Sequence, residues 1–85
     1  MKTWINYKDL LKQLPRFVKF ENHHLELFVN YNIGIEMWEV GYEDKYTAFR
    51  IFYNCDEDIC KALKCTLLKV EEYYEHRNNT EQKFI

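Results

Sequence analysis

The chain has 85 residues with a formal net charge of −2; 47% of them are apolar and 18% aromatic. This length and composition are typical of one compact domain, and the charge gives no general attraction to nucleic acid. The chain has no serine, which excludes a serine nucleophile, and its two isolated glycines, Gly34 and Gly41, exclude a glycine-rich phosphate-binding loop.

The first predicted element is a helix between Thr3 and Pro15. Thr3 can cap its N-terminus, and Pro15 ends it. The apolar residues between them recur at helical spacing on one stripe: Trp4, Tyr7, Leu10, Leu11 and Leu14. We expect that stripe to face the core.

The pattern then changes to the alternation typical of strands. Strands are expected at 16–21 and 25–31, joined by a tight hairpin turn at Asn22 and His23. The alternation places four apolar residues of the second strand on one face: Leu25, Leu27, Val29 and Tyr31.

A third strand is expected over residues 33–42. Its apolar residues change parity between Met37 and Trp38, which indicates a bulge or a strand covered on both faces. After a turn at 42–45, a fourth strand over 46–53 places three apolar residues on one side: Phe49, Ile51 and Tyr53.

A second helix is expected to begin at Asn54, with Glu57 completing a capping box, and to end near Arg77. Its inner stripe consists of Ile59, Leu63, Thr66, Leu67, Val70 and Tyr74. The fold class is therefore α+β, in the order α-β-β-β-β-α, with an antiparallel sheet meander and both helices on one face. Residues 1–77 form the domain, and 78–85 are expected to be a flexible tail.

Cys55, Cys60 and Cys65 lie five residues apart, which on a helix separates them by about 140° in direction. Zinc needs ligands that converge on one point, so we expect no metal site and no cofactor. The acidic residues that follow Cys55 suit the start of a helix. An odd cysteine count and the lack of a signal peptide or membrane span favour a cytoplasmic protein with reduced thiols.

The strands alternate, so one set of side chains should face away from the helices. This set contains several aromatic residues beside an arginine, which is the composition favoured at the centre of protein interfaces. We predict a partner-binding surface that includes Phe28, Trp38, Tyr46, Arg50 and Phe52. Leu68, expected on the outer side of the second helix near Cys65, is a further candidate contact.

Charge is segregated along the chain. Residues 1–20 carry a net charge of +4, residues 21–58 carry −7, and residues 59–85 carry +1. An acidic middle can speed association with a basic partner and repels nucleic acid. The acidic residues predicted to contact such a partner are Glu36, Glu39, Glu43 and Asp44. The alternative is that these residues form a merely solvated face.

The order of elements is similar to that of double-stranded RNA-binding domains. Their last helix starts with basic residues, whereas Asp56, Glu57 and Asp58 stand at that position here. The sheet offers only Lys19 and Arg50 for phosphate contacts. We therefore expect no enzyme but a protein–protein interaction module. The alternative is a small homodimeric regulatory or nucleic-acid-binding domain that uses the open sheet face.

Residues with AT-rich codons (Phe, Tyr, Met, Ile, Asn and Lys) number 37, which indicates a gene from a low-GC bacterium or its phages. In size, composition and acidic centre, the chain resembles phage-encoded inhibitors of host machinery, including anti-CRISPR proteins. The resemblance implies a host protein as partner, in the bacterial cytosol, with no membrane and no small-molecule substrate. The acidic residues would then imitate phosphates. The alternative partner is a second copy of this chain, which would form a homodimer.

Overall fold

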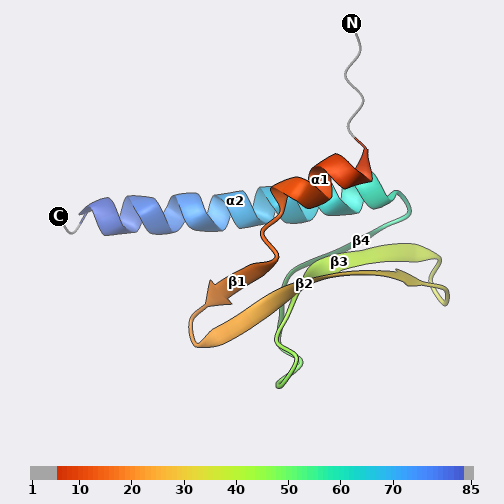
Figure 1. The fold of residues 1–85 in the computed structure, drawn as a ribbon, viewed down its shortest axis with the longest axis horizontal. Coiled ribbons are helices and arrows are strands. Elements are labelled where there is room, and N and C mark those ends of the chain that lie inside the picture. Colours follow the sequence, from red (N-terminus) through yellow and green to blue (C-terminus); the bar gives the residue numbers. More distant parts are fainter. Residues whose placement is uncertain (1–5, 84–85) are drawn as a thin grey trace, which may run out of the picture.

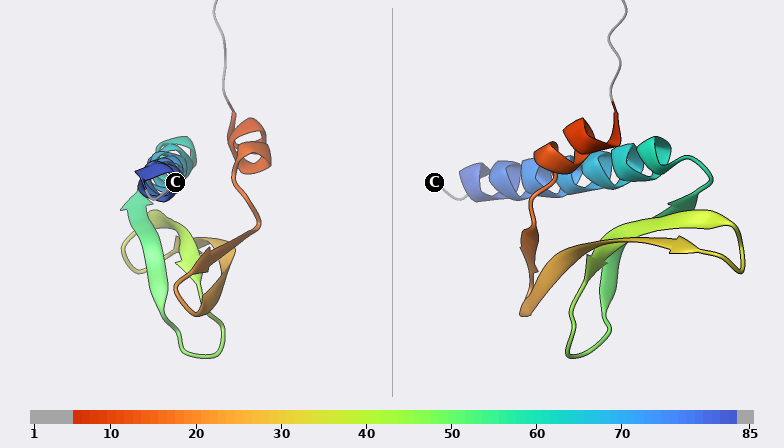
Figure 2. Two further views of the ribbon diagram at one scale, coloured as in Figure 1. Left: turned by 90° about the vertical axis from the view of Figure 1, so that its left-hand side faces the viewer. Right: turned by 45° about the vertical axis from the view of Figure 1, so that its right-hand side comes forward.

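The computed structural model describes the backbone of residues 6–83 and the side chains of residues 6–77 (Figure 1). The elements follow the order α1 (Tyr7–Gln13), β1 (Phe17–Phe20), β2 (His23–Asn32), β3 (Met37–Glu43), β4 (Arg50–Asp56) and α2 (Ile59–Lys83). The four strands form one antiparallel sheet in the order β1-β2-β3-β4. Both helices lie over the same face of this curled sheet (Figure 2). The predicted α+β fold class is confirmed.

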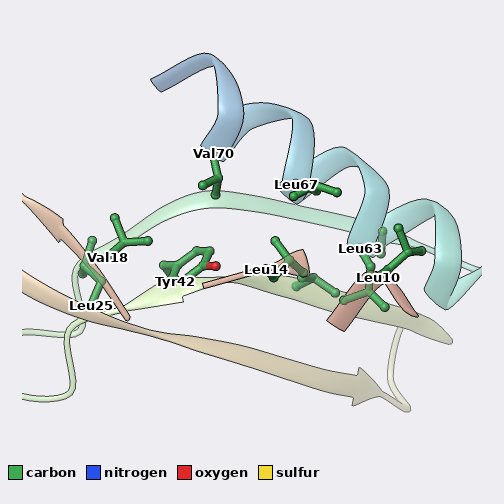
Figure 3. Packing of buried hydrophobic residues seen from close by; sticks show 10 residues of the cluster. Leu10, Leu14, Val18, Leu25, Tyr42, Leu63, Leu67 and Val70 are labelled. Carbon is green, nitrogen blue, oxygen red and sulfur yellow. The ribbon is translucent and has the colours of Figure 1, made fainter. Parts of the chain in front are cut away.

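The core lies between the helices and the face of the sheet that they cover, here called the inner face. Four buried side chains of the sheet, Val18, Leu25, Val40 and Tyr42, meet Leu10 and Leu14 of α1 and a stripe on α2 (Figure 3). That stripe consists of Ala62, Leu63, Leu67 and Val70. Its spacing of three and four residues brings it to one side of α2. The opposite face of the sheet, the outer face, has no helix over it.

Helix α1 is capped by Asn6, whose side-chain oxygen accepts a hydrogen bond from the backbone N–H of Asp9 at 3.0 Å. The predicted cap, Thr3, lies outside the described residues, as does Trp4. The helix ends at Leu14 with an extended backbone, as expected for the residue before a proline. The hydroxyl of Tyr42 donates to the carbonyl of Pro15 and so ties the end of α1 to the sheet.

The hairpin turns differ from the prediction by a few residues. The β1–β2 turn is formed by Glu21 and Asn22, with Glu21 at φ 56°, and His23 is the first residue of β2. The β2–β3 turn spans residues 33–36, so Ile33 and Ile35 are exposed turn residues and not part of a strand. The apolar residues change parity because Ile33 and Ile35 belong to this turn and only the residues from Met37 onward form the strand. The predicted bulge in the third strand is wrong.

The bulge lies in β4. The register with β3 shifts between Val40 and Tyr42, and Phe52 adopts a positive φ of 58°. A bulge places one extra residue in a strand, so Ile51 and Phe52 both pack against the core while Tyr53 turns to the outer face. The fourth strand is present, as β4, but the predicted placement of Tyr53 on the same side as Ile51 is wrong for this reason.

Helix α2 begins later than predicted. Asn54 and Cys55 belong to β4, and Asp58 caps the helix by accepting from the backbone N–H of Cys60 at 2.8 Å. The helix continues to Lys83, beyond the predicted end near Arg77, and its C-terminal part extends past the sheet (Figure 1). Tyr73, in place of the predicted Tyr74, packs on Phe20 and Phe52.

One buried polar group joins α2 to the bulge. Thr66 has no exposed surface, and its hydroxyl lies 3.0 Å from the carbonyl oxygen of Phe52. The amide of Asn54 donates to the same hydroxyl at 2.6 Å and to the carbonyl of Ala62 at 3.1 Å. A bulge leaves backbone groups without ladder partners, and this network supplies partners from the helix.

Candidate functional site

The outer face of the sheet carries a compact group of side chains from β2 and β4, here called the Arg50 cluster and made of Phe28, Arg50 and Tyr53. The guanidinium carbon of Arg50 lies 4.8 Å from the ring centre of Phe28 and 5.7 Å from that of Tyr53. The two rings stack on each other with centres 6.1 Å apart. Cation–π contacts of this length are attractive, so the arginine is held in place above the rings.

Gly41 of β3 leaves the space that the two rings occupy. It pairs with Phe28 on β2, and a Cβ at this position would stand 2.9 Å from Cα of Tyr53 and 3.3 Å from the ring of Phe28. No side chain fits there without a shift of backbone. The side chains of Val40 and Tyr42, on either side of Gly41 in sequence, fill the inner face. Gly41 has no side chain and leaves space on the outer face for the Arg50 cluster.

Glu39 borders the cluster and is held by three neutral donors. Its carboxylate accepts from the hydroxyl of Tyr53 at 2.8 Å and from the side-chain amides of Asn30 and Asn32 at 3.1 and 3.2 Å. The hydrogen bond from Tyr53, followed by those from the two asparagines, lowers the pKa of Glu39. The hydrogen bonds of Tyr53 with Cys55 and Glu39 raise the pKa of its phenol. At neutral pH, the site therefore pairs a carboxylate with a neutral phenol.

Other acidic side chains of the outer face are paired with cations. Glu43 lies 3.5 Å from the guanidinium of Arg50. Glu26 lies 2.6 Å from the ammonium of Lys45 and 3.4 Å from Arg16, and these contacts lower its pKa. Exposed pairs of this kind contribute little to stability but cancel much of the local charge.

The structure brings together four of the residues predicted to contact a partner. Phe28 and Arg50 form the Arg50 cluster, and Glu39 and Glu43 contact Tyr53 and Arg50 respectively. All four point to the outer face, because they alternate with the buried residues of their strands.

The predicted outward orientation of Phe52 and Trp38 is wrong. The bulge turns Phe52 to the inner face, where its ring contacts those of Tyr42 and Tyr73. Trp38 has the same parity as Val40 and packs against the edge of the core and against Tyr31. Neither residue is placed to act with the Arg50 cluster.

The prediction of an exposed Asp44 is also wrong. Asp44 is only 7% exposed, and its carboxylate accepts from His23 at 2.9 Å and from the backbone N–H of Tyr46 at 2.8 Å. The ring of His23 in turn stacks on Phe49, with centres 4.3 Å apart. The hydrogen bond with His23 is the main cause of the lowered pKa of Asp44. This aspartate organises the β3–β4 loop and cannot meet a partner.

Three further candidates lie apart from the Arg50 cluster. Tyr46 stands in the β3–β4 loop and is 97% exposed. Glu36 is an exposed residue of the β2–β3 turn with φ 55°. Leu68 is 58% exposed on α2, which covers the inner face of the sheet. They do not form one surface with Phe28 and Arg50.

Sequence reasoning missed Tyr53. Strict alternation of side chains predicts that Tyr53 faces the core. Residues 51–53 contain no glycine, so the sequence of this strand gives no indication of a bulge. The available signal was Gly41 on the neighbouring strand, because a glycine within a strand often marks a bulge or a close approach of backbone.

Within the part of the chain that the structure describes, no three His, Cys, Asp or Glu side chains are grouped so that they could hold a metal ion. Cys55, Cys60 and Cys65 do not form disulfide bonds; Cys60 packs against the core, and Cys55 lies 3.0 Å from the hydroxyl of Tyr53. Over the same described residues, neither helix combines the length and apolar character needed to cross a membrane.

Comparison of the chain with protein-family models, with curated proteins and with solved structures finds no match. The geometry of the outer face is therefore the basis for a functional proposal.

Proposed function

We propose that this protein is a non-enzymatic binding module that attaches to a larger protein through the outer face of its sheet, with Arg50 at the centre of the contact. The Arg50 cluster carries this proposal. It presents a guanidinium and two aromatic rings on the uncovered face of the curled sheet, and arginine and tyrosine are among the residues that contribute most to protein interfaces. The side chain of Arg50 is 46% exposed and already held by Phe28 and Tyr53, so little conformational freedom is lost on binding.

A protein partner fits this face better than single-stranded nucleic acid. Bases stack on aromatic side chains whose ring faces are free, and the phosphates need cations close by. Here the rings of Phe28 and Tyr53 stack on each other beneath Arg50. Glu39 and Glu43 border them and would repel a phosphate backbone.

The proposal includes inhibition of bacterial host machinery by a phage-encoded protein in the cytoplasm, in which acidic residues imitate phosphates. Asp44 is not among these acidic residues, because it is buried. Glu39 is its best-supported member, because its pKa is lowered and no cation lies within ion-pair distance among the described residues. An ionised carboxylate beside Arg50 suits a partner that presents both a cation and a carboxylate.

The test is capture of partners by the immobilised full chain from a nuclease-treated lysate of a low-GC bacterium. We expect a stoichiometric protein that is captured by the wild type, lost with Arg50→Ala, and weakened with Glu39→Gln. Leu68→Ala is the matched control, because it removes an exposed side chain from α2 and leaves the outer face intact.

Two outcomes would overturn the proposal. Equal capture by the wild type and Arg50→Ala would show that the outer face is not the contact. Recovery of nucleic acid in an untreated lysate, with no protein left after nuclease, would favour the nucleic-acid-binding alternative. Circular dichroism of each variant shows that a loss of binding is not a loss of fold.

A further inference from the structure

The second half of β2 has an open edge. β1 pairs with β2 only along His23 to Glu26, and one further backbone hydrogen bond joins Leu27 to Arg16 at 2.9 Å. β2 continues to Asn32, and its other side is paired with β3 along this whole length (Figure 1). Among the described residues, nothing lies in hydrogen-bonding contact with the free side of residues 28–32.

The backbone groups at this edge belong to Val29 and Tyr31. In an antiparallel sheet, successive residues direct their N–H and C=O groups to opposite sides of the strand. Leu27 bonds toward β1, so Val29 and Tyr31 point the same way, whereas Phe28 and Asn30 point toward β3. Their side chains are also unusually open for the inner face, at 36% for Val29 and 43% for Tyr31.

The outer strands of the sheet are protected by features that this edge lacks. On β1, the hydroxyl of Tyr73 donates to the carbonyl of Lys19. On β4, a bulge interrupts the strand, and Lys69 donates to the carbonyl of Tyr53. Proteins use charges, bulges and covering groups to prevent strand edges from pairing. Residues 27–32, Leu-Phe-Val-Asn-Tyr-Asn, contain no charge, proline or glycine, and their register with β3 has no bulge.

We propose that the free edge of β2 pairs with the same edge of a second copy of this chain, antiparallel about Asn30. In this register, Val29 of one copy opposes Tyr31 of the other, so that the outward N–H and C=O groups of both residues are satisfied. The pair joins a β-branched and an aromatic side chain, a favourable cross-strand combination. Each Asn30 uses its side-chain nitrogen to bond Glu39 of its own copy at 3.1 Å, on the side of β2 that faces β3.

The two-fold symmetry limits the assembly to a dimer, because the same edge is used once by each copy and the outer strands stay protected. The dimer sheet continues across both copies and leaves both outer faces open. Each dimer therefore presents two Arg50 clusters, and this assembly does not depend on the proposed partner of the outer face.

Light scattering coupled to size-exclusion chromatography tests the proposal. We expect the molar mass of the full chain to rise from the monomer value of 10.6 kDa to twice that value as the concentration increases. Val29→Pro removes one outward N–H without touching the β3 ladder and should hold the mass at the monomer value. Val29→Thr keeps this N–H and the branched side chain, and should still dimerise. A monomer at every concentration, larger assemblies, or a dimer of Val29→Pro would each overturn the proposal.

Amide hydrogen exchange of the wild type followed by NMR covers the case in which Val29→Pro does not fold. The amides of Phe28 and Asn30, which point to β3, should be protected at all concentrations and serve as internal controls. The amides of Val29 and Tyr31 should become protected only as the dimer forms. Protection of these two amides in the dilute monomer would mean that the chain itself covers the edge, and would overturn the proposal. Arg50→Ala should leave both measurements unchanged.

Discussion

Gly41 and Tyr53 approach so closely across the β3–β4 ladder that a Cβ on Gly41 would lie 2.9 Å from Cα of Tyr53. Gly41→Ala should therefore destabilise the fold by about 1–3 kcal/mol, the usual cost of forcing extra volume into a packed site. The free energy of unfolding from urea titration measures this. Gly34→Ala is the control, because its Cβ would meet only the side-chain oxygen of Asn32, at 3.2 Å, and should cost less. Equal losses for the two variants would contradict the proposed role of Gly41.

Thr66→Val should destabilise the protein although it preserves the shape of the side chain. The valine leaves the carbonyl of Phe52 and the amide of Asn54 without the hydroxyl that joins them. Unsatisfied buried polar groups cost about 1–3 kcal/mol each. Thr66→Ser keeps the hydroxyl and should lose less. Chemical denaturation compares the two variants, and a valine variant as stable as the serine variant would show that the network does not hold the bulge.

The lowered pKa of Asp44 makes part of the stability depend on pH. The folded state binds a proton at Asp44 less readily than the unfolded chain does, so this contribution is present above the ordinary aspartate value of about 3.9 and is lost as the pH falls through the lower folded pKa. Asp44→Asn should reduce stability at neutral pH and flatten the loss on acidification. Urea midpoints measured between neutral and acidic pH test this.

Salt separates this contribution from that of Glu26, whose pKa is also lowered by its pairs with the exposed cations Lys45 and Arg16. High salt screens a pair whose cation is exposed, whereas the contact of Asp44 with His23 is partly buried and is screened less. The difference between the wild type and Asp44→Asn should therefore persist in high salt. Its disappearance would mean that Asp44 acts only through surface charge.

Tyr53→Phe should raise the pKa of Glu39 toward its ordinary value, because the phenol hydroxyl supplies the main hydrogen bond that lowers it. NMR titration of the side-chain carboxyl carbon measures this pKa directly. Tyr31→Phe removes a hydroxyl from the inner face and should leave Glu39 unchanged. An unchanged Glu39 in both variants would show that Asn30 and Asn32 suffice to hold the carboxylate.

The order and type of the elements could be predicted because hydrophobic periodicity records which side chains are buried. Leu10, Leu14, Leu63 and Val70 follow the helical period, and Leu25 follows the strand period. The errors lie where backbone geometry breaks the period. The β2–β3 turn contains Ile33 and Ile35, whose types are typical of strands. The side chain of Asn32 stabilises this turn by accepting from the backbone N–H of Gly34 at 2.9 Å.

The candidate site was predictable only in part for the same reason. Arg50 precedes the bulge in β4, and Phe28 belongs to β2, whose register is regular. Both residues therefore keep the alternation that predicts the outer face. Phe52 lies in the bulge with a positive φ. The sequence does not predict this conformation, because residues other than glycine rarely adopt it. The sequence predicts a surface position for Asp44 because its partner, His23, is distant in sequence, and only the folded chain brings the two together.

Helix α2 continues past the sheet, and this has a practical use in imaging. A chain of this size is too small for electron cryomicroscopy on its own. A second protein joined to the far end of α2 by an uninterrupted helix would be carried at a defined angle, away from Arg50 and from the free edge of β2. The resulting particle would gain mass while both binding surfaces stay accessible.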